Sequence, residues 1–181
     1  MNHEQPTRPP GRVASLHLHP ETPGAPLQQV QFVELVADKG LHGDTRYFGR
    51  LSRETGKPTR RQVSLIEREQ IAEHAAALGL DTIPPGAVRS NIETTGIDLV
   101  ALVGREIKIG QVVLFLNAPR DPCHKMDAIC MGLRQRMLNN KQGVMAEVRC
   151  SGTIRVGDVI ELIAPVAAGG GSDEIGPRPS V

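Results

Sequence analysis

Short apolar runs recur along the chain, and most of them are bounded by glycine, proline or other turn residues. Alternation with a period of two is typical of strands, so these runs predict a mainly β domain, closed as a barrel or packed as a sandwich. In the run QVQFVELV, Val30, Phe32 and Glu34 are expected on one face. The predicted strands are 12–18, 29–36, 61–66, 88–94, 105–109, 112–116, 144–148, 153–156 and 158–163.

Two segments have the spacing of helices instead. In 67–79 every third or fourth residue is apolar, and a glycine at the end is a common helix stop. The same spacing recurs in 128–138, at Ile129, Leu133 and Met137. The pattern therefore predicts an α+β chain that is mainly β, with a few short helices.

Two ten-residue stretches resemble each other: IKIGQVVLFL (107–116) and IRVGDVIELI (154–163). Each has a central glycine, Gly110 or Gly157, which favours a bend or bulge where a strand turns a barrel corner. We interpret the repeated pattern as the same local strand arrangement used twice within one domain.

The ends of the chain differ in composition from its middle. Residues 1–10 are polar and proline-rich, and 167–181 are rich in glycine, serine and proline. We expect a disordered lead at 1–10, a folded domain at 11–166 and a flexible tail at 167–181.

Charge and hydropathy exclude several classes of protein. With 21 basic and 20 acidic residues, the net charge of +1 lacks the basic footprint of a nucleic-acid binder. No apolar run approaches the roughly 18 to 20 residues that span a bilayer, and the N-terminus lacks the apolar core of a secretory signal. Three cysteines, an odd number, favour free thiols in a reducing cytoplasm.

The three cysteines lie in different surroundings. Cys123 follows Asp-Pro and precedes His-Lys on a predicted strand-to-helix connection, where cationic neighbours favour the reactive thiolate. Cys130 falls in a helical stripe and Cys150 ends an apolar strand, so both are expected to be small buried hydrophobes. From the residues alone, Cys123 is equally consistent with packing and with chemistry.

Common catalytic and binding motifs are missing. No Cys-x-x-Cys occurs, and His17 and His19, two apart on a strand, are expected to be solvated rather than to bind zinc. The nucleophile elbow of hydrolases, the phosphate-binding Walker A loop and the dinucleotide-binding glycine pattern are also absent.

Two other stretches contain candidate anion-binding groups. In PPGAVRSNIETTG (84–96), period-two geometry would place Arg89 and Asn91 on one strand face, either as phosphate donors or as a buried structural pair. In KGLHGD (39–44), two glycines suggest a turn whose N–H groups could bind an anion, although an ordinary loop is the alternative.

These stretches, together with RQVSLIE, LVGREIKIGQVVLFL, DPCHKM and GVMAEVRCSGTIRVGDVIEL, occur in an order that resembles the MOSC domain. This module is named after the C-terminal region of molybdenum-cofactor sulfurases. The resemblance spans roughly residues 11–164, and its most specific parts are Asn-Ile-x-Thr-x-Gly and the Pro-Cys before a basic region. It implies a MOSC-type β-barrel with a few short helices.

The resemblance also implies a site for the molybdenum cofactor, molybdopterin with Mo. Cys123 would bind the metal or hold a persulfide sulfur, and thiolate is a soft ligand suited to such a metal. His124 or Lys125 would supply a proton. The cofactor would be held by Arg89, Asn91, Thr94 and Thr95, and by the glycine-rich loop at Gly40, His42, Gly43 and Asp44.

Two functions follow from the resemblance, and a binding barrel without chemistry is the third alternative. A molybdoenzyme would reduce a small N-hydroxylated substrate; with no ferredoxin-like segment in the chain, it would need electrons from an external reductase. A sulfur carrier would instead deliver a Cys123 persulfide to cofactor or cluster assembly. The aminotransferase-like domain of the sulfurases is absent, so pyridoxal phosphate binding is not expected.

Overall fold

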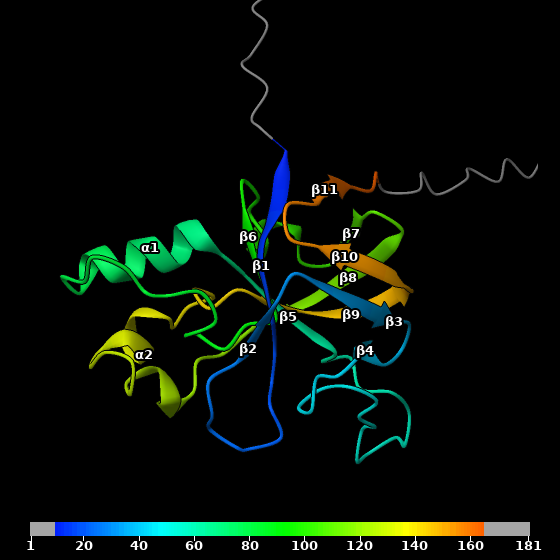
Figure 1. Ribbon diagram of the computed structural model, residues 1–181, viewed down its shortest axis with the longest axis horizontal. Helices are drawn as coiled ribbons and strands as arrows, with labels where there is room; N and C mark the ends of the chain where they lie inside the picture. Colours follow the sequence, from blue (N-terminus) through cyan, green and yellow to red (C-terminus); the bar gives the residue numbers. More distant parts are fainter. Residues whose placement is uncertain (1–9, 165–181) are drawn as a thin grey trace, which may run out of the picture.

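The structure is a computed structural model and describes residues 10–164. The regular secondary structure of this part of the chain is mostly short strands, as the alternating sequence predicts (Figure 1). The strands are β1 (Gly11–Leu18), β2 (Gln28–Val30), β3 (Phe32–Val36), β4 (Gly40–Leu41), β5 (Val63–Glu67), β6 (Ile92–Thr95), β7 (Glu106–Ile109), β8 (Val112–Pro119), β9 (Val144–Cys150), β10 (Gly152–Arg155) and β11 (Val159–Leu162). The helices are α1 (Arg68–Ala77) and α2 (Leu133–Arg136), with 3-10 turns η1 (Val100–Leu102) and η2 (His124–Met126). None of these helices combines the length and apolar character that crossing a membrane requires.

The main sheet closes on itself as a barrel. Its order is β11-β7-β8-β9-β5-β6-β1-β2, and β11 pairs back onto β1 through Gly11–Ile160 and Arg12–Val159. Within this sheet β5 and β6 pair in parallel, and the other neighbours are antiparallel. A smaller sheet, β10-β3-β4, lies beside it. The mainly β barrel with few helices is therefore confirmed.

Two apolar clusters stabilise this arrangement. The larger fills the barrel with side chains such as Leu16, Leu65 and Leu114, all fully buried. The smaller packs α1 and the η2–α2 segment against the outside of the barrel, around Ile66 and Leu133. Figure 1 shows α1 and α2 together on one side of the barrel, away from the β10-β3-β4 sheet.

Several local predictions differ from the structure. The run 29–36 is two strands, β2 and β3, because the chain bends at Gln31 between the two sheets. Phe32 and Glu34 share one face of β3 as predicted, and it is the exposed face, with Phe32 59% exposed; Val30 lies in β2 instead and is half-buried. Val33 and Leu35, which alternate with these residues along β3, are buried and face the core.

The predicted helix at 128–138 is much shorter than its spacing indicated. Helix α2 begins only at Leu133, because Gly132 takes a left-handed φ of 90° that a continuous helix cannot contain. The Asp127 carboxylate accepts hydrogen bonds from the N–H groups of Gly132 and Arg134, which fixes this break. The apolar stripe nevertheless packs on the smaller cluster.

The two central glycines of the repeated stretches lie in turns rather than inside strands. Gly110 joins β7 to β8 in a hairpin, so the predicted bulge there is wrong. Gly157 lies between β10 and β11, where the chain passes from the smaller sheet to the barrel, as expected of a corner. Of the expected ends, residues 1–9 of the lead and all of 167–181 lie outside the described residues.

Candidate functional site

Four connections meet below one end of the barrel. They are the loop after β1, the loop after β4, the loop before β6 and the segment after β8 (Figure 1). Between them lies a hollow of about 250 Å³, lined by His19, Pro20, Glu21, Thr22, Pro23, Gly24, Thr45, Arg46, Arg89 and Lys125. Three of these side chains are cationic lysine or arginine, so the hollow suits an anionic ligand.

Asp44 holds the loops of this hollow together. Its Oδ2 accepts hydrogen bonds from His19 N (2.9 Å), His19 Nδ1 (2.8 Å) and Asn91 Nδ2 (2.7 Å). Its Oδ1 accepts from the backbone N–H groups of Arg46 (3.0 Å) and Tyr47 (2.9 Å). Burial raises the pKa of Asp44, but the hydrogen bonds from His19 outweigh it and the net pKa is lowered. A buried carboxylate therefore organises the site.

Asn91 is the second centre of this network. Its Oδ1 accepts hydrogen bonds from Ser64 N (3.1 Å) and Ser64 Oγ (2.8 Å), and its Nδ2 donates to His17 O (3.1 Å) and to Asp44. The Asn91 side chain is fully buried and its amide is used inside the protein. Its position supports the loops rather than offering a free donor to a ligand.

Arg89 lies in a turn and not on a strand. Strand β6 begins only at Ile92, so the predicted strand face shared by Arg89 and Asn91 is wrong. The turn arises because Arg89 N donates to Gly86 O and Arg89 takes a left-handed φ of 61°. Such a backbone is costly for arginine, and strain of this kind is found at functional sites.

The Arg89 side chain enters the hollow with spare hydrogen-bonding capacity. Its NH1 group donates to Ala25 O (2.9 Å), while its buried Nε has no partner among the described residues. The buried His19 Nε2 is likewise without a partner in residues 10–164. Two unpartnered polar atoms thus belong to residues that line the same hollow.

Glu93 fixes the loop that carries Arg89. This fully buried carboxylate accepts hydrogen bonds from Gly86 N (2.7 Å), Arg68 NH1 (2.9 Å) and Ser15 Oγ (3.2 Å). It thereby links the loop before β6 to the start of α1 and to β1.

Cys123 lies next to this loop at the start of η2. The thiol is half-buried and packs on the smaller apolar cluster. Arg120, three residues earlier, is buried and donates to Ser90 Oγ (2.9 Å) and Arg89 O (3.1 Å). These bonds join the cysteine segment to the Arg89 turn.

The guanidinium groups of Arg89 and Arg120 share an electrostatic environment with the thiol. Burial lowers the pKa of both arginines, and the charge of Arg46 lowers it further. The negative charge that Cys123 can carry acts in the opposite direction on both. A thiolate here would have two guanidinium groups within electrostatic reach.

Lys125 and His124 differ in position. Lys125 is half-buried and lines the hollow, whereas His124 is exposed and does not line it. The other cysteines also differ, because Cys130 is half-buried but Cys150 is exposed. The expectation that Cys150 is buried was wrong, since strand β9 leaves the core before its last residue.

The threonines and the glycine-rich loop lie partly elsewhere. Thr94 and Thr95 pair with Val13 and Arg12 in β1, toward the end of the barrel opposite His19. Neither threonine lines the hollow.

The 39–44 loop does not form the open anion-binding turn considered above. Its Gly40 is part of β4, while the N–H groups of His42 and Asp44 donate to Glu34 O and Leu41 O. His42 is exposed and its ring lies 5.6 Å from that of Phe48. Gly43 has a φ of 87°, which lets the chain turn toward Asp44. Only Asp44 of this loop is tied directly to the network beside the hollow.

Sequence reasoning missed His19, Arg46 and Arg120. His17 and His19 were expected to be solvated, but both are buried, because the loop before β6 covers the outer face of β1. The alternation in HLH gave the only hint of a shared face. No group of three histidine, cysteine or acidic side chains within the described part of the chain is placed to bind a metal ion.

Solved structures with the same fold define the class of this barrel. YuaD from Bacillus subtilis superposes with a TM-score of 0.70 at 22% identity, covering 83% of this chain and 94% of that one. YiiM from Geobacillus stearothermophilus gives 0.65 at 18% identity over 86% and 76%, and YiiM from Escherichia coli gives 0.62 at 22% identity over 90% and 72%.

Sequence comparison identifies the family. The MOSC domain model matches residues 35–161, and this chain therefore belongs to the MOSC domain family. The resemblance inferred from the motifs is confirmed. No curated protein matches the chain at comparable stringency.

Proposed function

We propose that this protein binds the pterin form of the molybdenum cofactor and reduces small N-hydroxylated compounds with electrons from an external reductase. Membership of the MOSC domain family, which is associated with this cofactor and with sulfur transfer, supports the class of ligand. The observation that carries the proposal is the Arg89 turn, which presents a half-buried cation with an unpartnered Nε beside Cys123.

The residues present fit such a cofactor. A thiol supplies a soft metal ligand, and Arg89, Arg46 and Lys125 supply cations for a phosphate. The unpartnered Arg89 Nε and His19 Nε2 leave polar capacity for a ligand. When bound, the cofactor supplies two-electron redox chemistry at molybdenum.

The roles of the side chains follow from their positions. Cys123 would bind the metal, Arg89 the cofactor phosphate, and Lys125 would hold a proton near the substrate. Overall, an N-hydroxylated amine takes up two electrons and two protons and yields the amine and water. Asp44 and Asn91 would keep the loops in place without contacting the ligand.

Replacing Arg89 separates ligand binding from folding. Arg89→Gly should lower cofactor retention by roughly ten- to a hundredfold, because a charged hydrogen-bond donor to phosphate is lost. The thermal midpoint of the empty protein should stay within a few degrees, because glycine takes a φ of 61° without strain. Bound pterin per chain and the midpoint are the two measurements.

The matched variant is Arg89→Lys, which keeps the charge but loses the planar fork of donors. It should restore only part of the retention. Unchanged pterin content in Arg89→Gly together with a collapsed midpoint would mean that Arg89 serves the fold alone.

The Cys123→Ser variant tests the metal ligand directly. Protein from a host that makes the cofactor should contain molybdenum, and Cys123→Ser should lose most of it, because serine is a harder and weaker ligand. Cys150→Ser, which removes an exposed thiol at the end of β9, should keep the metal. Molybdenum absent from the wild type, with a cyanide-releasable sulfur on Cys123, would favour the sulfur carrier instead.

A further inference from the structure

A second hollow adjoins the candidate site and has an unusual charge. Its volume is about 390 Å³, and four arginines contribute to its wall: Arg46, Arg50, Arg53 and Arg61. No acidic residue lines it. We name this hollow the arginine pocket.

Among the acidic residues that the structure describes, none pairs with the four guanidinium groups. Elsewhere in residues 10–164, Arg60 and Arg149 pair with Glu147, and Arg68 pairs with Glu93. None of the arginines of the arginine pocket is in an ion pair within this range. In a chain whose net charge is only +1, this is a local excess of positive charge that an anion would neutralise.

Backbone hydrogen bonds fix the loop that forms the arginine pocket. Leu51 and Pro58 form a β-bridge, Thr59 N donates to Arg50 O (3.0 Å), and Ser52 N donates to Lys57 O (2.8 Å). Ser52 and Thr59 also line the hollow. This small hairpin fixes the backbone that carries Arg50 and Arg53, and Arg50 NH1 donates to Arg46 O (3.2 Å), while the four arginine side chains stay exposed to solvent.

The arginine pocket adjoins the hollow beside Arg89, whose lining includes Lys125 but not Cys123. Arg46 lines both hollows, and the backbone N–H groups of Arg46 and Tyr47 are held by Asp44. The pKa of the buried Arg120, which donates to Arg89 O, is lowered mainly by burial and further by the charges of Arg46 and Arg61. The two hollows therefore share Arg46 in their walls.

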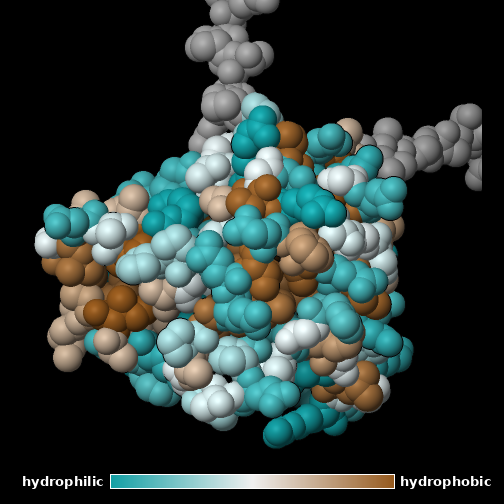
Figure 2. All heavy atoms as spheres, viewed as in Figure 1, coloured by the Kyte–Doolittle hydropathy of each residue, from teal (hydrophilic) through white to brown (hydrophobic). Residues whose placement is uncertain are grey.

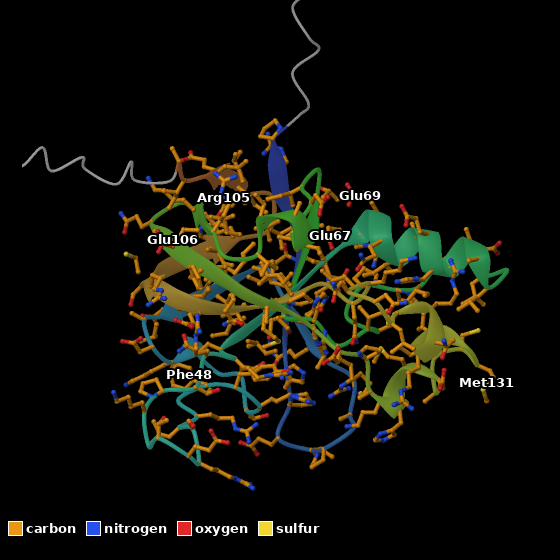
Figure 3. All side chains as sticks on the ribbon, turned by 180° about the vertical axis from the view of Figure 1, so that it is seen from behind. Phe48, Glu67, Glu69, Arg105, Glu106 and Met131 are labelled. Atoms are coloured by element: carbon orange, nitrogen blue, oxygen red, sulfur yellow. The ribbon has the colours of Figure 1, made fainter. Side chains whose placement is uncertain are left out.

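Figures 2 and 3 show the part of the molecule in which the arginine pocket lies. Phe48, labelled in Figure 3, lies among the loops below the barrel, on the side away from α1 and α2. In Figure 2 the surface over the lower loops is mostly teal and white, with a smaller brown group at the lower right. The arginine pocket itself is lined by four arginines beside the exposed Leu51, so its charge favours an anionic ligand.

We propose that the arginine pocket binds the phosphate group of a phosphorylated small molecule whose other end enters the hollow beside Arg89. A guanidinium group can donate two parallel hydrogen bonds to the oxygens of a phosphate. Four guanidinium groups around one hollow provide more hydrogen-bond donors and more positive charge than a carboxylate needs. The phosphate belongs either to the substrate or to a nucleotide extension of the cofactor. The proposal of a phosphate site depends only on the arginine pocket. The proposal that the ligand is the substrate rests on the proposed function.

Binding of adenosine 5′-monophosphate by the purified full chain tests the phosphate site. Calorimetry should detect it, with adenosine as the uncharged control binding at least tenfold more weakly, and affinity should fall as salt rises. Arg50→Ala and Arg53→Ala should each weaken binding by roughly ten- to a hundredfold. Arg134→Ala, which removes an exposed arginine from α2, should not change it.

Three results would overturn the proposal. They are equal binding of adenosine, an unchanged affinity in both pocket variants, and a loss in Arg134→Ala as large as in Arg53→Ala. The last would mean that diffuse charge, not the pocket, attracts the nucleotide. These binding measurements need no molybdenum. They therefore test the phosphate site even if the protein does not reduce N-hydroxylated compounds.

The two sources of phosphate are separated in protein from a cofactor-producing host. If Arg50→Ala/Arg53→Ala keeps wild-type molybdenum and pterin but raises KM for a phosphorylated N-hydroxy substrate over its unphosphorylated form, the phosphate is the substrate's. If the double variant loses pterin, and wild-type protein releases one nucleotide per pterin on denaturation, the phosphate is the cofactor's.

Discussion

Gly143→Ala should prevent the barrel from folding stably. An added Cβ would lie 1.9 Å from Leu65 O and 2.8 Å from Ile66 Cα, inside the backbone of β5. Gly143 also has a φ of 72°, and its carbonyl accepts the hydrogen bond of Arg120 N (2.9 Å). We expect a loss of about 4 kcal/mol or more in the free energy of unfolding, since the strands must separate. The thermal midpoint and the soluble yield are the measurements.

Gly79→Ala is the control for backbone strain alone. Gly79 has a similar φ of 69°, but no atom lies within 4 Å of an added Cβ. It should cost about 1 to 2 kcal/mol, the usual penalty for a left-handed residue. Equal losses in Gly79→Ala and Gly143→Ala would show that the close approach to β5 is unimportant.

Asp44→Ala should have the second largest effect. The Asp44 carboxylate is buried and accepts three hydrogen bonds at Oδ2 and two at Oδ1. Its removal leaves buried donors on His19 and Asn91 without an acceptor, so we expect a loss of about 3 to 5 kcal/mol, or about 10 °C in the midpoint. Asp81→Ala, at an exposed position, should change the midpoint by no more than about 2 °C.

The effect of Asp44 should depend on pH in one direction. Its pKa is lowered in the folded protein, so its stabilising contribution is present above the ordinary aspartate value of 3.8 and is lost as pH falls through the folded pKa. The wild type should therefore approach Asp44→Ala in stability only in acid, below about pH 4. A gap between the two midpoints that stays constant from pH 7 to pH 3 would contradict this account.

Local sequence predicted elements well where one pattern dominated. The apolar run 144–148 and the helical stripe of 67–79 correspond to β9 and α1, because each packs against apolar side chains of the core. Prediction failed where a backbone conformation decided the outcome. Gly132 shortens α2, and the Arg89 turn replaces the start of a strand.

The candidate site was predicted only in part for a different reason. Its central residue, Asp44, is tied to His19 and Asn91, which are 25 and 47 positions away in the chain. Spacing and periodicity describe neighbours within a turn or a strand and carry no information on such partners. The positions of Arg89 and Cys123 came from local composition and from family resemblance, whereas the network that holds them together required the fold.

The Asn91 network also has a consequence for how the protein is made. Asn91 is joined to Ser64, Asp44 and His17 across 27, 47 and 74 residues, so its contacts form only after long loops have closed. A chain still on its way to the native state lacks the hollow beside Arg89. Any ligand of the hollow therefore binds after folding and stabilises only the finished barrel.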